Sequence, residues 1–221
     1  MNERERSPIP DGVWIQCGDC GEAIFAREFE RTGKVCPHCG RHDALSAAER
    51  AAYVLDEFDA DEHLSGPLHA VGEIDSFPAA LAVIDAESAE VSSGKLFHSV
   101  AELAGLLKPL IVFAANGTGA GEESAEPRLR LARALKQLGN ERLPYILVVT
   151  DGSEEDGYRA FLPPGDIVLA ETSRPKPPDN PLESAHPHID NFLTRHELSE
   201  TLPKLLAFFR QRRSGDGTRP N

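Results

Sequence analysis

The chain has 221 residues, 40% of them hydrophobic, which is enough for one medium domain with a buried core and a small additional module. Asp and Glu outnumber Lys and Arg by 36 to 23, and the net charge of −13 disfavours nucleic-acid binding, which depends on positive charge. No apolar run is as long as a membrane span, and residues 1–10 lack the apolar stretch of a signal peptide. We therefore expect a cytoplasmic protein.

Residues 1–10 are predicted to form a flexible tail and residues 11–45 a small metal-binding module. The module contains two closely spaced cysteine pairs, Cys17 with Cys20 and Cys36 with Cys39. Each pair can direct two sulfur atoms toward one point, and four thiolates complete the tetrahedral shell of a zinc ion. Two disulfides are the alternative, but a reducing cytoplasm favours zinc. Because four cysteines leave no coordination position open, the pattern predicts one structural zinc ion per chain.

Short strands are expected on both sides of the first cysteine pair, at residues 13–16 and 22–25. Glycine follows the second cysteine of each pair, at Gly21 and Gly40, where it permits a tight backbone turn. These features predict a zinc ribbon, in which each cysteine pair closes a short turn.

A larger domain is predicted to begin at residue 46 and to end at residue 213. Ser46 and Glu49 have the spacing of a capping box, which predicts that a helix starts here and continues to Phe58. The acidic residues between 56 and 62 are interpreted as a solvated face at the end of this helix.

From residue 66 onward, strands are expected to alternate with helices. Continuous apolar runs are typical of strands buried on both faces, and they occur at 81–84, 110–114, 145–149 and 167–170. Amphipathic segments predict helices at 95–107, 127–138 and about 196–212. Prolines make 174–188 an extended connector, and 214–221 is expected to be a disordered tail. The alternation predicts an α/β fold with mainly parallel strands.

Two segments that follow apolar strands are candidates for chemistry, because ligands of parallel α/β cores bind where strands end. In residues 114–121, three glycines leave backbone N–H groups open to an anion or a polarised carbonyl; an ordinary glycine-rich turn is the alternative. In residues 150–157, four carboxylates have the chemistry to hold a hard cation or to act as acid and base; an exposed acidic loop is the alternative.

The chain resembles, in order, the carboxyltransferase β subunit of bacterial acetyl-CoA carboxylase. The matching segments are 12–14, the two cysteine pairs, 28–31, 35–39, 50–57, 143–151, 165–171, 189–193 and 195–198. The resemblance implies a crotonase-like ββα-spiral core, here shortened, behind a zinc ribbon. It also implies binding of acetyl-CoA and, together with an α subunit, transfer of a carboxyl group from carboxybiotin to give malonyl-CoA.

The resemblance is weaker at the candidate site. The family holds developing oxyanions with backbone amides of two glycine-rich turns, the first reading Ser-Gly-Gly-Ala-Arg. Here that turn is Asn-Gly-Thr-Gly-Ala, which leaves Gly117, Thr118 and Gly119 as the candidate oxyanion or acyl-CoA-binding residues. The two glycines of the second turn fall on Glu155 and Asp156, whose carboxylates would repel an oxyanion.

Three functions follow as hypotheses. The first is that of a carboxyltransferase-β-like protein in an acyl-CoA carboxylase-type system, which would serve fatty-acid or polyketide metabolism. Its oxyanion site is eroded, so we expect the protein to be divergent or non-catalytic on its own. It would use structural zinc, an acyl-CoA ligand, and carboxybiotin only through a carboxyltransferase α-type partner. The second is a repurposed, non-enzymatic binding or assembly partner, and the third a zinc-ribbon nucleic-acid-binding regulator. The role of the acidic run Glu154, Glu155 and Asp156 is left open.

Overall fold

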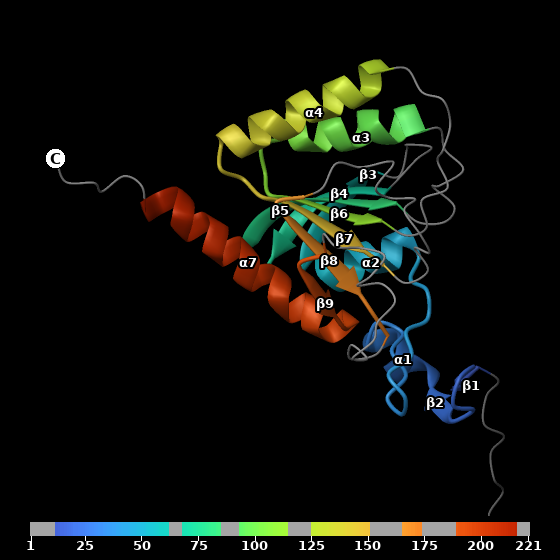
Figure 1. Ribbon diagram of the computed structural model, residues 1–221. Helices are drawn as coiled ribbons and strands as arrows, with labels where there is room; N and C mark the ends of the chain where they lie inside the picture. Colours follow the sequence, from blue (N-terminus) through green and yellow to red (C-terminus); the bar gives the residue numbers. More distant parts are fainter. Residues whose placement is uncertain are drawn as a thin grey trace, which may run out of the picture.

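The computed structural model describes residues 12–61, 68–84, 93–114, 125–150, 165–173 and 189–215. Within these residues a small N-terminal module precedes an α/β domain in which helices cover both faces of one sheet (Figure 1). Among these residues, none of the helices has the length and the apolar composition of a membrane-spanning segment.

The N-terminal module contains two short strands and a helix. Strands β1 (Trp14–Gln16) and β2 (Ala23–Phe25) pair in antiparallel fashion, and α1 (Ala26–Arg31) follows β2 directly. The two predicted strands are therefore confirmed, whereas α1 was not predicted. The hydrophobic core of the module is very small: among its described residues it consists of the buried Cys17, Ile24, Phe29 and Cys36.

The larger domain is built on a seven-stranded sheet in the order β3-β4-β5-β6-β7-β8-β9. The strands are β3 (Glu57–Asp61), β4 (Leu68–Ile74), β5 (Phe77–Ile84), β6 (Leu110–Ala114), β7 (Tyr145–Val149), β8 (Ile167–Glu171) and β9 (Asn191–Leu193). The pairs from β5 to β9 are parallel, and β3, β4 and β5 are antiparallel to one another. All residues of β6 and β7 are buried, as their uninterrupted apolar sequences predict.

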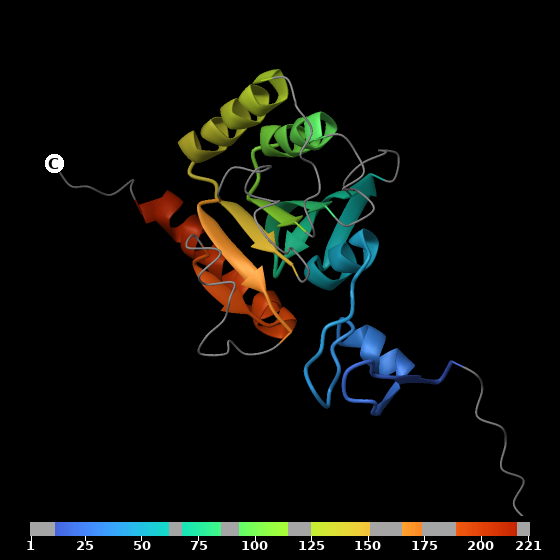
Figure 2. The ribbon, with the colours of Figure 1, turned by 45° about the vertical axis from the view of Figure 1, so that its right-hand side comes forward.

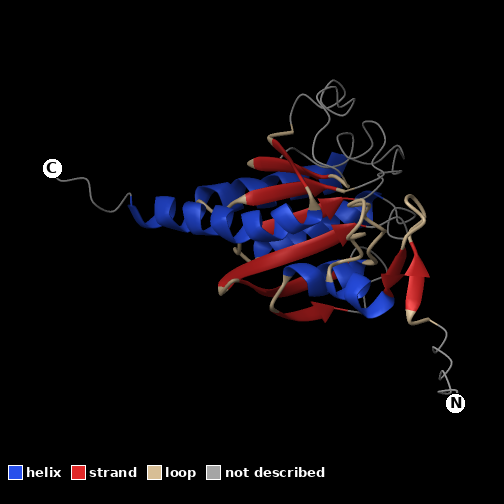
Figure 3. Cartoon of the chain, turned by 90° about the horizontal axis from the view of Figure 1, so that it is seen from below, coloured by secondary structure: helices blue, strands red, loops and turns tan. Residues whose placement is uncertain are grey.

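Two pairs of helices cover the sheet. Helices α3 (Ser93–Gly105) and α4 (Ala125–Asn140) pack on one face, and α2 (Ala47–Val54) and α7 (Arg195–Gly215) pack on the other. In Figure 2 the ribbon module lies at the end of the sheet toward which the arrow of β8 points. Figure 3 shows the last turns of α7 extending at the opposite end of the molecule.

The predicted helix from Ala47 to Phe58 is wrong in its second half. Helix α2 ends at Val54, and Glu57–Asp61 forms the edge strand β3. Glu57, Phe58 and Asp59 alternate between polar and apolar residues, which is the period of a strand, and Phe58 packs against the core. Charged side chains are typical of edge strands because they oppose pairing with other chains. Strands β4 and β9 were not predicted.

The last helix is longer than predicted. Helix α7 continues through Pro203 and extends to Gly215. The predicted tail at 1–10 and the connector at 174–188 lie outside the described residues.

The predicted capping box at the start of α2 is confirmed. The backbone N–H of Glu49 donates to Ser46 Oγ at 3.3 Å, and the N–H of Ser46 donates to a carboxylate oxygen of Glu49 at 2.9 Å. Ser46→Ala should lower the free energy of unfolding by about 1 kcal/mol, because the N–H of Glu49 loses its acceptor. Ser46→Gly should cost only a few tenths of a kcal/mol. Urea denaturation measures both, and equal stability of the wild type and the alanine variant would contradict this account of the helix start.

Candidate functional site

Two matching turns hold the four cysteines. In the first, the N–H of Cys17 donates to the carbonyl of Glu22 at 2.9 Å, and the N–H of Gly21 donates to the carbonyl of Cys17 at 2.9 Å. The second turn repeats this pattern, with Cys36 donating to Arg41 at 2.8 Å and Gly40 to Cys36 at 2.9 Å. Gly21 and Gly40 have φ values of 72° and 73°, in the left-handed region that favours glycine. The predicted glycine turns are thus confirmed.

The sulfur positions fit a zinc ion. All four Sγ atoms lie within 4.8 Å of one another, and the distances from Cys17 to Cys39 and from Cys20 to Cys36 are 3.7 and 3.8 Å. Four sulfurs placed about 2.3 Å from a central zinc in a tetrahedron are separated by about 3.8 Å. A disulfide would require about 2.05 Å, and none of the four cysteines forms one. The geometry therefore favours the metal site over the two disulfides.

The electrostatics of the cluster also favour a bound cation. Hydrogen bonds from the N–H groups of Cys20 and Asp19 lower the pKa of Cys17 to about 6. A hydrogen bond from the N–H of Glu22 lowers the pKa of Cys20, but desolvation and the neighbouring sulfurs outweigh it and raise that pKa. Several thiolates cannot ionise side by side without a positive charge between them. A zinc ion held by the four cysteines would supply that charge and would fix the fold of the module.

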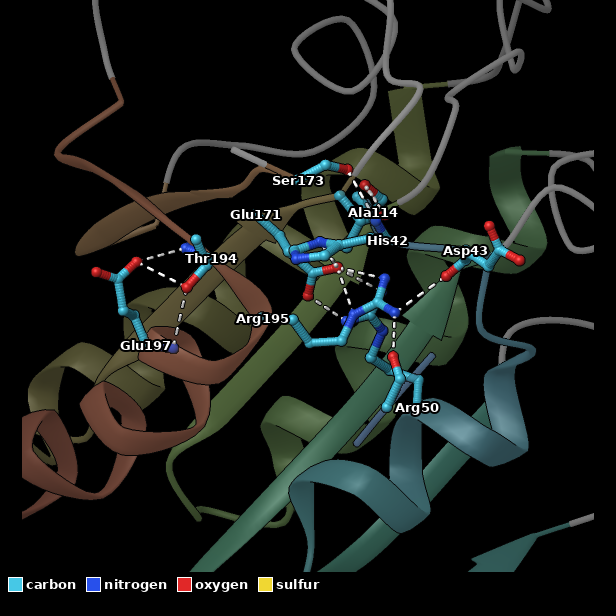
Figure 4. A network of polar contacts seen from close by, with 11 residues as sticks. His42, Asp43, Arg50, Ala114, Glu171, Ser173, Thr194, Arg195 and Glu197 are labelled. Carbon is cyan, nitrogen blue, oxygen red and sulfur yellow. Dashed lines mark hydrogen bonds and ion pairs between the residues drawn. The ribbon is translucent and has the colours of Figure 1, made fainter. Parts of the chain in front are cut away.

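A buried ionic network lies where the ribbon meets the sheet (Figure 4). The carboxylate of Glu171, the last residue of β8, is fully buried between the guanidiniums of Arg50 and Arg195. Arg195 donates from Nε and Nη2 to the same carboxylate oxygen, at 3.0 and 2.8 Å, and Arg50 donates to both oxygens, from Nη2 at 3.1 Å and from Nη1. Desolvation would raise the pKa of Glu171, but the two arginines outweigh it and lower that pKa.

The same network anchors the ribbon. Nη1 of Arg195 donates to the backbone carbonyls of Gly33 and Asp43, the latter at 3.0 Å. The N–H of His42 donates to Ser173 Oγ at 3.3 Å, and the buried imidazole of His42 has Nδ1 3.8 Å from the Glu171 carboxylate. Residues from the ribbon, β8 and α7 therefore meet at one buried carboxylate. We infer that the ribbon sits in a fixed position on the carboxyl end of the sheet.

Gly40 shows how closely the ribbon approaches the sheet. A Cβ atom at this position would lie 3.3 Å from the backbone oxygen of Ser173, which follows β8. Glycine is thus favoured at position 40 by the backbone turn and by the close packing of the ribbon against the larger domain.

The two loops that carry the candidate oxyanion residues begin at this same end of the sheet. Ala114, at the end of β6, pairs with Val149 of β7, and the N–H of Thr150 donates to the carbonyl of Ala114 at 3.0 Å. Val149 in turn pairs with Ala170, the residue before Glu171. Gly117, Thr118 and Gly119 lie outside the described residues, as do Glu154, Glu155 and Asp156. Their predicted roles therefore remain predictions.

Sequence reasoning did not single out the Glu171 network. The signal was present, because Glu171 directly follows four apolar residues of a buried strand, and Arg50 lies among alanines near the middle of a short helix. Charges at such positions indicate buried ion pairs. The partners were not apparent, since Glu171 is separated from Arg50 by 121 positions and from Arg195 by 24.

Comparison with known structures identifies the fold. The chain resembles transcarboxylase 12S with a TM-score of 0.55 and 13% sequence identity, over 85% of this chain and 45% of the other. It resembles the β subunit of geranyl-CoA carboxylase from P. aeruginosa with a TM-score of 0.50 and 16% identity, over 76% of this chain and 42% of the other. The α/β core thus has the crotonase-like carboxyltransferase fold, as predicted.

Sequence comparison identifies the family. The family model described as acetyl-CoA carboxylase zinc finger domain matches residues 14–39. The acetyl-coenzyme A carboxylase carboxyl transferase subunit beta of Pelotomaculum thermopropionicum is 30% identical, over 92% of each chain. That of Carboxydothermus hydrogenoformans is 28% identical, over 95% of each. The chain belongs to the family of acetyl-CoA carboxylase carboxyltransferase β subunits.

Proposed function

We propose that this chain is the carboxyltransferase β-type subunit of an acyl-CoA carboxylase system and that it is not catalytic on its own. The family relationship over 92% of the chain is the observation that carries this proposal. The ribbon position supports it, because the ribbon is anchored at the end of the sheet where the loops after β6 and β7 begin.

The acyl-CoA thioester would bind at these loops. Gly117, Thr118 and Gly119 lie in the segment after strand β6, which ends at Ala114, and would offer backbone N–H groups to the thioester oxygen. The ribbon would form one side of the site, and a zinc ion held by the four cysteines would stabilise its fold. Carboxybiotin would enter only on a partner chain, which we propose to be a carboxyltransferase α-type subunit.

We expect no turnover by the isolated chain because the sequences of the loops after β6 and β7 differ from those of the family. Loss of one oxyanion donor reduces turnover about 10²–10³-fold in well-studied enzymes. Here Thr118 replaces one glycine of the first turn, and Glu155 and Asp156 replace both glycines of the second. Side chains at positions 155 and 156 would obstruct the approach of an oxyanion to the backbone N–H groups, so a partner chain would have to complete the site if the complex is to transfer a carboxyl group.

A second candidate function is non-enzymatic assembly within such a system. The two carboxylates at Glu155 and Asp156 favour it, because an oxyanion would be repelled there. Both candidate functions require a partner chain, and they differ only in whether the complex transfers a carboxyl group. The third hypothesis, nucleic-acid binding, gains no support from a chain with a net charge of −13.

Co-expression with a carboxyltransferase α-type subunit, followed by a carboxyl-transfer assay, tests the proposal. We expect a stable complex whose turnover is lost in Gly117→Val, because a branched side chain there would displace the backbone N–H groups. Gly139→Val is the matched control, since a Cβ at Gly139 meets open space. A stable complex without turnover would support the assembly function instead. Failure to form a complex would contradict both.

A further inference from the structure

A concave site lies at the opposite end of the sheet from the ribbon. Each of three neighbouring strands begins beside a proline: Pro78 in β5, Pro109 before β6 and Pro144 before β7. The carbonyls of Pro109 and Pro144 accept hydrogen bonds from Ala80 and Leu110, at 2.8 and 2.9 Å. Proline has no N–H and a fixed φ, so the three residues form a rigid, apolar floor without a donor of their own.

Helix α7 forms the wall of this groove. Leu206 and Phe209 line it from the helix, and Phe77 lines it from the start of β5. The cavity measures about 100 Å³, well below the roughly 300–1,000 Å³ of sites for drug-sized ligands. Its size therefore suits a short aliphatic chain and excludes a nucleotide.

The rim of the groove is positively charged. Arg142, Arg210 and Arg213 line it, and among the residues that the structure describes no Asp or Glu does. This is unusual in a chain with 36 acidic and 23 basic residues. The guanidinium of Arg210 lies 4.4 Å from the centre of the Phe77 ring, so a cation is held directly above an apolar wall. Arg213 is paired with Glu141 at 3.9 Å, but both side chains are about half exposed and such a pair is weak.

We propose that this groove binds a short aliphatic carboxylate. The aliphatic chain would lie on the proline floor, and the carboxylate would accept hydrogen bonds from the arginines at the rim. The site is distinct from the proposed acyl-CoA site, because it lies at the amino ends of β5, β6 and β7 and the glycine-rich loop follows the carboxyl end of β6. It does not depend on the proposed function.

Calorimetric titration of the zinc-loaded, full-length protein with hexanoate tests the proposal. Hexanol, which has the chain without the charge, and acetate, which has the charge with little chain, are the comparison ligands. We expect hexanoate to bind at least about tenfold more tightly than either, with an affinity that falls at high salt because the arginines are exposed. Equal binding of hexanol and hexanoate would overturn the role of the arginines. Absence of hexanoate binding up to tens of millimolar would overturn the site.

Two variants locate the binding. Arg210→Met should weaken hexanoate binding about three- to tenfold through loss of a charge-assisted hydrogen bond. Arg142→Gly should act similarly, and its backbone is suited to glycine, because Arg142 has a φ of 56° and glycine adopts this conformation more easily.

Arg212→Met is the matched control. Arg212 belongs to the same helix and carries the same charge, but it lies over Phe208 at 5.6 Å and does not line the groove. Hexanoate binding by this variant should stay within twofold of the wild type. A loss as large as that of Arg210→Met would indicate general attraction to the basic helix end and would overturn the proposal.

Discussion

Replacement of Glu171 by glutamine is expected to lower the free energy of unfolding by about 3–5 kcal/mol. The variant keeps the shape of the side chain and removes its charge, which leaves the buried guanidiniums of Arg50 and Arg195 without a counter-charge. Their side chains are only 6% and 2% exposed, so water cannot replace the carboxylate. Urea denaturation followed by circular dichroism measures the loss.

The control for this variant is Glu28→Gln. Glu28 also pairs with an arginine, Arg31, but the two side chains are 51% and 70% exposed. Its loss should therefore cost less than about 1 kcal/mol. If Glu171→Gln lowered the free energy of unfolding no more than Glu28→Gln does, the Glu171 network would not stabilise the fold.

The same carboxylate predicts a pH dependence. Because the arginines lower the pKa of Glu171 in the folded protein, its contribution is fully present above the ordinary value of 4.5. As the pH falls from 4.5 through the lowered pKa, the unfolded chain takes up the proton before the folded protein does. The stabilisation that Glu171 contributes is therefore lost over this range of pH. The difference in stability between wild type and Glu171→Gln should thus be constant near neutral pH and shrink below about pH 4.5.

Removal of zinc is expected to unfold the ribbon and to leave the larger domain folded. The ribbon buries four residues in its core, too few to be stable without a metal. The only tryptophan of the chain, Trp14, lies in the ribbon and stacks edge-on against Phe25 with ring centres 5.7 Å apart. Strong chelation should therefore lower the fluorescence anisotropy of Trp14 sharply while the circular dichroism of the larger domain changes little.

Single substitutions extend this test. Cys36→Ser should reduce the zinc content to well below one ion per chain, because a hydroxyl cannot replace the thiolate. His38→Ala, next to Cys39, should retain one zinc, since four cysteines complete the shell and His38 is exposed. Wild-type protein with much less than one zinc per chain, or an anisotropy that is insensitive to chelation, would contradict the metal site.

Much of the fold was predictable because its signals are local. The apolar runs at 110–114 and 145–149 form β6 and β7 with the predicted bounds. Each run has five residues, which is a usual length for a buried strand and too short for a stable helix. The capping box at Ser46 marked the start of α2. The cysteine spacing predicted the metal cluster, because each pair closes its own short turn.

Other features depend on contacts between distant residues. The sequence predicts a solvated face at the end of a helix for the acidic residues 56–62; Glu57 and Asp59 are exposed, but pairing with β4 makes 57–61 a strand. The position of the ribbon depends on Arg195, which reaches carbonyls 152 and 162 positions away. Local patterns carry no information on such pairings, and they did not indicate that the ribbon is held by a carboxylate at the end of β8.

We propose that the chain retains a site for an acyl-CoA at the carboxyl end of the sheet, beside the zinc ribbon. Calorimetric titration of the zinc-loaded protein with acetyl-CoA and malonyl-CoA tests this claim most directly. We expect binding with a dissociation constant on the order of micromolar, which corresponds to a binding free energy of about −8 kcal/mol. Absence of binding up to millimolar acyl-CoA would contradict it.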